Sequence, residues 1–324
     1  MFQTMRRALL LSTAFLLVAC GSDDDHPAPE PQRSNLAQTA TTAGLTALVA
    51  AANKAGLVPT LESPSTNVTV FAPNNTAFGN LATALGFASA DALVAALSPA
   101  TLRSILEYHL VAGQRDAAAL TTGGATQNSL YTFEGAAARL GIVTSGGVQV
   151  RDAVLTNARV VTADVRASNG IVHVVDKVLV PPGVLNIVQM AQANPDFSSL
   201  VGAVAARGLV PTLSGAGPLT VFAPTNAAFT AAAATIATLT PDQVSTVLSY
   251  HVLATQVLSS GIPFGTPVTT FAAPRTITIT AGPAPAIASI ADSTAVPAAI
   301  VAVDIRASNG VIHVIDKVLI PSPL

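Results

Sequence analysis

The chain has 324 residues, of which 50% are hydrophobic and only 10% are charged. This composition excludes an intrinsically disordered protein, because there is ample apolar surface to bury, and the length suits two ordinary domains. The formal net charge is −2, aromatic residues make up 4% of the chain, and there is no Trp. A basic, aromatic-rich surface for nucleic acid is thereby excluded, and we expect no nucleic acid partner.

Residues 1–19 are predicted to be a signal peptide. Arg6 and Arg7 precede an apolar run over residues 8–19, which is shorter than the roughly 20 residues needed to span a bilayer and is typical of a signal-peptide core. The run ends at Cys20, the single cysteine of the chain, and this junction resembles a bacterial lipobox. The resemblance implies cleavage before Cys20 and lipid attachment to it. An ordinary signal peptide with a chance cysteine and an N-terminal anchor helix are the alternatives.

Residues 20–35 are predicted to be the lipidated cysteine and a flexible tether, because this segment is rich in Pro, Asp and Ser and lacks apolar periodicity. We therefore expect a protein that is secreted across the inner membrane and anchored by its lipid. The outer membrane or cell surface and the periplasm are the candidate locations. The membrane is then one partner, held through the N-terminal lipid anchor.

The remainder of the chain repeats itself once. Four segments recur in the same order at an offset of 140–152 residues, which is the size of a domain and far above the roughly 20–50 residues of a solenoid unit. The matched segments are 56–61 with 208–213, 69–78 with 220–229, 108–109 with 250–251, and 166–170 with 306–310. Two homologous domains are therefore predicted, over residues 36–181 and 184–321.

Each repeat is predicted to begin with helices. In the second repeat, a helix over residues 185–193 precedes a second one, whose apolar residues have helical spacing and which ends at Gly208. The first repeat has only the brief polar segment 35–42 in place of the first of these helices. The first helix of domain 1 is therefore expected to be short or frayed.

A short strand, a short helix and a longer helix follow in each repeat. Ser98-Pro99 and Thr240-Pro241 each place a capping hydroxyl before a proline at the first helical position, which predicts the start of the longer helix. The first repeat has extra residues here, and its Ala- and Leu-rich segment 81–97 is predicted to add a helical turn or two. The strands are expected at 70–71 and 221–222, and the short helices after the caps Asn74 and Thr225.

The second half of each repeat is predicted to be β-structure. Val, Ile and Thr dominate it, and Asn-Gly pairs are hairpin signals. Residues 160–165 are expected to pair with 171–180 across Asn169-Gly170. The second repeat is expected to pair 301–305 with 311–320 in the same way.

These motifs resemble the fasciclin domain family. Its first signature is similar to Thr-Val-Phe-Ala-Pro-Thr-Asn-x-Ala-Phe, which stands at 220–229 and, slightly altered, at 69–78. Its second is similar to Asn-Gly-Val-Ile-His-Val-Ile-Asp, which stands at 309–316 and, slightly altered, at 169–176. A middle Tyr-His is also present twice. The resemblance implies an α/β (α+β) fold, in which each of two tandem domains is a β-sandwich-like wedge with helices packed on one side.

The paired histidines are the candidates for chemistry, but the neighbours of His109 and His173 are apolar, so we interpret the imidazoles as buried and hydrogen-bonded. The aspartates near each hairpin are interpreted as local ion pairs, such as Asp176 with Lys177, or as turn hydrogen bonds. No catalytic residue, metal ligand or cofactor is expected.

The Tyr-His region has two interpretations. In animal matrix members of the family this region is associated with integrin-type recognition, so the resemblance implies a contact site. The alternative is a structural role for the same residues, Tyr108, His109, Tyr250 and His251. The second signature supplies residues expected to be structural: Asn169, Gly170, His173, Asp176, Asn309, Gly310, His313 and Asp316.

The resemblance, together with the predicted anchor and tether, favours a membrane-anchored adhesion or interaction module outside the cytoplasm, with an unknown protein or polysaccharide partner at the cell surface. The alternative is a periplasmic or surface carrier that holds a small apolar ligand between helices and sheet, because many small Ala side chains would allow a cavity. An enzyme is not expected, since the sequence has no nucleophile elbow and no phosphate-binding loop.

Overall fold

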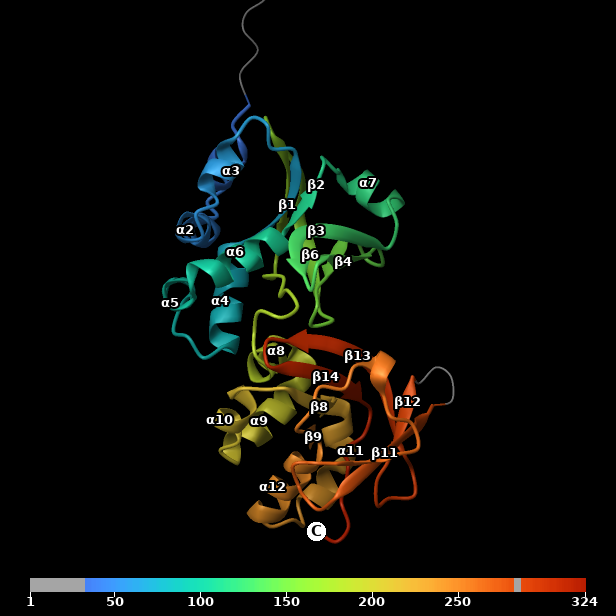
Figure 1. The fold of residues 1–324 in the computed structure, drawn as a ribbon. Coiled ribbons are helices and arrows are strands. Elements are labelled where there is room, and N and C mark those ends of the chain that lie inside the picture. Colours follow the sequence, from blue (N-terminus) through green and yellow to red (C-terminus); the bar gives the residue numbers. More distant parts are fainter. Residues whose placement is uncertain (1–32, 283–286) are drawn as a thin grey trace, which may run out of the picture. The chain divides into compact units, whose positions relative to one another are not determined.

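The computed structural model describes residues 33–282 and 287–324, drawn in colour in Figure 1. The predicted signal peptide over 1–19 and the predicted lipidation at Cys20 lie outside these residues, as does most of the tether. Within the described part of the chain, no helix combines the length and the apolar character needed to cross a membrane.

Domain 1 contains seven helices and seven strands. The helices are α1 (Leu36–Thr42), α2 (Thr46–Lys54), α3 (Val58–Glu62), α4 (Asn75–Ala84), α5 (Ala90–Ala96), α6 (Pro99–Tyr108) and α7 (Ala117–Thr122). The strands are β1 (Val68–Pro73), β2 (Leu110–Ala112), β3 (Thr126–Phe133), β4 (Ala136–Val143), β5 (Gln149–Arg151), β6 (Asn157–Ala167) and β7 (Gly170–Val175). These seven strands form a closed barrel.

Domain 2 repeats this order with small changes. Its helices are α8 (Ile187–Gln192), η1 (Pro195–Phe197), α9 (Ser198–Ala206), α10 (Val210–Ser214), α11 (Asn226–Ile236), α12 (Pro241–Tyr250) and η2 (Ser259–Gly261). Its strands are β8 (Leu219–Pro224), β9 (Val252–Leu253), β10 (Pro267–Thr269), β11 (Thr276–Ala281), β12 (Ala288–Ala291), β13 (Ala298–Ala307) and β14 (Gly310–Ile315). The strands lie in one sheet with the order β10-β11-β12-β13-β14-β8-β9.

A parallel pair of strands lies at the centre of each domain. In domain 1, β1 runs parallel to β7, with Val70 opposite Val172, while the other pairings are antiparallel. In domain 2, β8 runs parallel to β14 in the same way. Both faces of these strands are covered, so β1, β8 and β14 are buried along their whole length without alternation.

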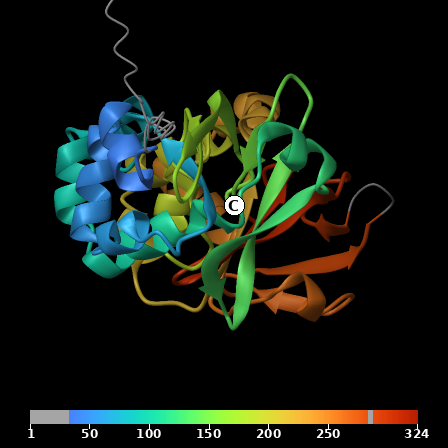
Figure 2. The same cartoon turned by 90° about the horizontal axis from the view of Figure 1, so that it is seen from above.

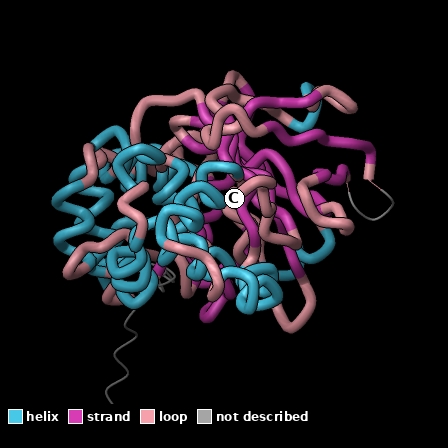
Figure 3. Tube along the Cα trace, turned by 90° about the horizontal axis from the view of Figure 1, so that it is seen from below, coloured by secondary structure: helices cyan, strands magenta, loops and turns pink. Residues whose placement is uncertain are grey.

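Helices and strands are separated within each domain. In domain 1, α1 to α6 gather on one side of the strands, at the left of Figures 1 and 2. Figure 3 shows the same separation by secondary structure. The predicted α/β class, with helices packed on one side of the strands, is confirmed.

Capping explains where the helices begin. The side chains of Asn74 and Thr225 accept hydrogen bonds from the third backbone N–H of α4 and α11, and Ser98 and Thr240 do the same for α6 and α12. These four predicted caps are confirmed. The extra residues of the first repeat form α5, which begins after the Ser89 cap.

The expectation of a short or frayed first helix in domain 1 is wrong. The segment forms α1, which has 7 residues, whereas its counterpart α8 has 6. Asn35 and Gln38 form a complete capping box, in which each side chain bonds the other residue's backbone N–H. The counterpart α8 begins with the same capping box, formed by Asn186 and Gln189.

The hairpins form where they are predicted, but the turn is shifted by one residue. Ala167 pairs with Gly170, so the two loop residues are Ser168 and Asn169, and Gly170 is the first residue of β7. A Cβ at Gly170 would lie 2.4 Å from the carbonyl oxygen of Val68 on the parallel neighbour β1. Glycine at this position is therefore required by the close approach of two strands.

Candidate functional site

The two Tyr-His pairs lie at the ends of α6 and α12 and are buried. The Tyr108 hydroxyl donates to the carbonyl of Arg139 over 2.9 Å, and the Tyr250 hydroxyl donates to the carbonyl of Thr276 over 2.8 Å. Tyr108 is 0% exposed and Tyr250 is 4% exposed. Neither tyrosine is presented at the surface of its domain.

The histidines of these pairs use both ring nitrogens inside the fold. His109 Nδ1 donates to the carbonyl of Ile105 at 2.7 Å, and its Nε2 accepts from the backbone N–H of Leu179 at 2.9 Å. His251 makes the equivalent bonds to Val247 and Leu319. Burial disfavours the charged ring, and it lowers the pKa of both histidines to about 4.

The histidines of the second signature are also engaged. His173 Nε2 donates to the carbonyl of Arg115 at 2.8 Å, and its Nδ1 faces the backbone N–H of Asp164 at 3.3 Å. His313 repeats this arrangement with Val257 and Asp304. No group of three or more His, Cys, Asp or Glu residues in the described segments is arranged to hold a metal ion.

The asparagine of the second signature joins the hairpin to the helices. Asn169 is buried; its Oδ1 accepts from Leu36 N at 2.9 Å, and its Nδ2 donates to the carbonyls of Leu61 and Ser63, each at 2.9 Å. In domain 2, Asn309 makes the same three kinds of bond. The start of α1 and the end of α3 are thereby held by one side chain.

The aspartates near each hairpin bond the backbone locally. Asp176 Oδ1 accepts from Arg159 N at 2.7 Å, and Asp316 accepts from Ala299 N at 2.8 Å. Asp164 has φ 60° and Asp304 φ 61°, and they accept from the first turns of α7 and η2. None of these contacts brings two carboxylates together for acid–base chemistry.

The sequence interpretation paired Lys177 with Asp176. In the structure Lys177 has a different partner. Its ammonium bonds the buried carboxylate of Asp152, which also accepts from Val180 N at 3.1 Å. Lys317 bonds Asp292 in the same way, at 3.0 Å. The two aspartates were missed because the pairs span 25 residues, and only the recurrence of Asp at equivalent places in both repeats could have indicated them.

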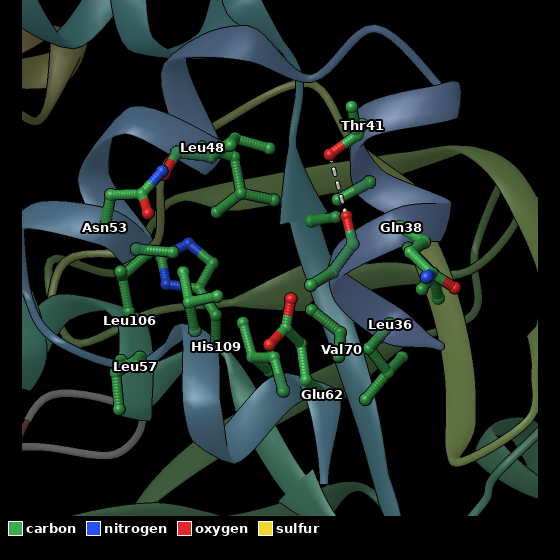
Figure 4. A pocket seen from close by; sticks show the side chains of 18 of the residues that line it. Leu36, Gln38, Thr41, Leu48, Asn53, Leu57, Glu62, Val70, Leu106 and His109 are labelled. Carbon is green, nitrogen blue, oxygen red and sulfur yellow. Dashed lines mark hydrogen bonds between the residues drawn. The ribbon is translucent and has the colours of Figure 1, made fainter. Parts of the chain in front are cut away.

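A pocket of about 400 Å³ lies between the helices and the central strands of domain 1 (Figure 4). This volume falls in the range of roughly 300–1,000 Å³ that holds small molecules. Buried apolar side chains form its walls, among them Leu48, Leu57, Leu106 and Val70. The sequence pointed to such a space only in general terms, through its many alanines between helices and sheet.

The polar residues of the pocket are exposed and lie on the helices. Gln38 and Thr41 belong to α1, Asn53 to α2 and Glu62 to α3. In Figure 4, Gln38 and Thr41 lie on the opposite side of the pocket from Asn53. His109 reaches the pocket, but its two nitrogens are already bonded to the backbone.

The structure defines two tandem α/β domains whose signature-motif polar groups are bonded internally, and the comparisons give the family. The family model described as "Fasciclin domain" matches residues 43–181 and 195–321. The chain belongs to the fasciclin domain family. The predicted resemblance is therefore confirmed.

Relatives of the chain are found in bacteria and animals. Protein sll1483 of a Synechocystis strain is 37% identical over 142 residues, which are 42% of this chain and 74% of the relative. Transforming growth factor-beta-induced protein ig-h3 of Sus scrofa is 31% identical over 271 residues, or 82% of this chain, but these span only 36% of the relative. Cell surface glycolipoprotein MPB83 of Mycobacterium bovis is 37% identical over 139 residues, 40% of this chain and 58% of the relative.

One solved structure covers most of the chain. It is a domain pair from the insect cell adhesion molecule Fasciclin I, with a TM-score of 0.43 and 17% identity, over 88% of this chain and 95% of that chain. Membership of the fasciclin domain family supports an adhesion or interaction module.

Proposed function

We propose that the protein is a membrane-anchored interaction module that acts outside the cytoplasm, with lipid on Cys20 and with both fasciclin domains available to a protein or polysaccharide at the cell surface. The observation that carries the proposal is the tandem arrangement of two complete family domains behind a predicted lipobox and tether. The relative MPB83 is named as a cell surface glycolipoprotein, which supports a lipid anchor for this chain.

A binding role is proposed in place of catalysis. The histidines and the hairpin aspartates of both signatures bond the backbone of their own domain. A general base or nucleophile needs a polar atom within reach of a substrate. The ring nitrogens of the four histidines are buried and face backbone partners of their own domain. The interaction surface is therefore sought on the exposed parts of the domains and not at the buried Tyr-His pairs.

The anchor is tested by comparing cells that express the wild type with cells that express Cys20→Ser. We expect the wild-type protein to carry the added mass of its acyl chains, to sediment with membranes, and to be cleaved by protease added to intact cells. Cys20→Ser should lose the added mass and the sedimentation, because no lipid holds it. A wild-type chain of unmodified mass would refute lipid anchoring.

The interaction role is tested by attachment. Deletion of the gene should reduce cell attachment and aggregation, wild-type protein should restore them, and Cys20→Ser should not. Treating the target surface with protease or with glycosidase then distinguishes a protein from a polysaccharide partner. Attachment, biofilm and aggregation that are unchanged by the deletion would count against the proposal.

A carrier of a small apolar ligand is the second candidate function. The pocket in domain 1 favours it, because its walls are apolar and its volume suits a small molecule. A carrier and an interaction module are compatible in one chain, since the pocket lies within a single domain.

A further inference from the structure

The two domains differ at one equivalent place. In domain 2, the space between the first helices and the central strands is only about 30 Å³, and the residues that line it are all apolar. Its lining residues occupy the same elements as those of the domain 1 pocket, with α8, α9 and β14 in place of α1, α2 and β7. The fold can therefore close this space, and the hollow in domain 1 is not a requirement of the architecture.

Side-chain size contributes to the difference: three aligned lining positions carry the larger side chain in domain 2, and one, Leu110 against Val252, carries it in domain 1. Ala37 of α1 corresponds to Val188 of α8, and Ala52 of α2 corresponds to Val204 of α9. On the central strand, Val172 corresponds to Ile312. Each of these three positions carries the larger side chain in domain 2. Because a well-packed interior is the usual outcome of folding, smaller residues at three facing positions point to a space kept open for a ligand.

The charge of the lining restricts the ligand. Of the twenty residues that line the pocket, none is Lys or Arg, and Glu62 is the single acidic one. His109 is not a cation at neutral pH, since its ring is buried and both nitrogens are bonded to the backbone. A carboxylate or phosphate head group would find no positive partner here and would be repelled by Glu62.

A neutral polar group would find partners at the exposed edge of the pocket. Gln38, Thr41 and Asn53 are exposed and offer amide and hydroxyl groups there. Such groups fix the orientation of a ligand whose apolar body lies deeper. The apolar body would contact Leu48, Leu106 and the central strands.

We propose that domain 1 alone binds an uncharged, largely apolar small molecule, such as a long-chain alcohol or a terpenoid alcohol, in the pocket between α1, α2, α3 and β1, while domain 2 has no such site. This proposal names the ligand class for the carrier role and is independent of the surface-contact role. Its failure would leave the attachment experiments unaffected, and their failure would leave this site in place.

The test uses the full chain with Cys20→Ser, so that no attached acyl chain competes for the pocket. The probe is N-phenyl-1-naphthylamine, which is uncharged and fluoresces in apolar surroundings. We expect saturable binding of one probe molecule per chain. The double substitution Ala37→Val and Ala52→Val, which introduces the side chains of domain 2, should weaken binding at least about tenfold, because each added methyl group takes volume from an apolar pocket.

The control is Ala50→Val, which makes one change of the same kind at an exposed position of α2 outside the pocket lining. It should bind the probe like the unsubstituted protein, and circular dichroism should show that all variants are folded. Equal probe binding by the double variant and the control, or no saturable binding by the unsubstituted protein, would overturn the site.

Competition tests the ligand class. Decanol should displace the probe at neutral pH, whereas decanoate, which has the same chain length and a negative charge, should need a concentration at least about tenfold higher. Displacement by decanoate at the same or a lower concentration would overturn the assignment to uncharged ligands.

Discussion

Acidification from pH 7 to pH 4 is expected to lower the free energy of unfolding of each domain by on the order of 3 kcal/mol. His109 and His251 are fully buried and neutral, with pKa values lowered to about 4 from 6.5. In the unfolded chain both rings are exposed to water and have the ordinary histidine pKa of about 6.5. The unfolded state therefore gains protons before the folded state does, and stability falls as pH drops from 6.5 to 4.

The measurement is urea unfolding at several pH values between 7 and 4, with the imidazole nitrogens followed by NMR. The variants His109→Gln and His251→Gln remove one titrating ring each, so each should flatten the pH dependence of its own domain and leave that of the other unchanged. A ring that titrates near pH 6.5 in the folded protein would contradict the prediction.

Acid destabilisation below pH 4 has a separate origin. Burial raises the pKa of Asp292, but hydrogen bonds from Thr294, Ile320 and Lys317 outweigh it and hold the pKa below its usual value of 3.8. The stability that this carboxylate contributes is present above pH 3.8 and is lost as pH falls further. The histidine effect thus falls mainly between pH 6.5 and pH 4 and the aspartate effect mainly below pH 3.8, with overlap near pH 4.

The substitution Asn169→Ala is expected to destabilise domain 1 by about 2–4 kcal/mol. It removes the partner of the Leu36 N–H and of the Leu61 carbonyl. It leaves the Ser63 carbonyl with only its bond from the N–H of Thr66. Asn169→Asp should cost at least as much, because a carboxylate oxygen would then face two carbonyl oxygens. Urea unfolding gives the change in free energy, and Asn309→Ala should have the same effect on domain 2.

The matched control is Asn128→Ala, which alters an exposed asparagine of β3 and should change stability by less than about 0.5 kcal/mol. Because Asn169 holds the start of α1 and the end of α3, two elements that line the pocket, its loss should also weaken probe binding. A variant Asn169→Ala as stable as the control would show that the three bonds contribute little.

The sequence predicted the elements whose signals are local. Ser98 and Thr240 precede Pro and begin helices as expected, and the Asn-Gly pairs lie at hairpins. The turn was misplaced by one residue because the requirement for Gly170 comes from Val68, which is distant in the chain. The helix α1 was underestimated because its stability depends on a polar capping box and a bond to Asn169.

The candidate site was less accessible to sequence reasoning. Repetition of His109 and His251 indicated a shared role but not the partners of their Nε2 atoms, which are backbone N–H groups about 70 residues further along. The pocket is linked to Ala37 and Ala52, which stand where the second repeat has Val188 and Val204. The sequence alone could not show that these side chains line a pocket, because the volume of a side chain matters only where it packs against a facing element.

The parallel pairing of β1 with β7 affects how each domain can fold. Val68 pairs with Gly170, so the central strand of domain 1 has no parallel neighbour until the end of the domain is available. Contacts between residues so far apart in sequence require closure of a long loop and slow the folding rate. In an exported chain of the kind proposed, the first domain would therefore complete its central sheet only after residues 170–175 have crossed the membrane.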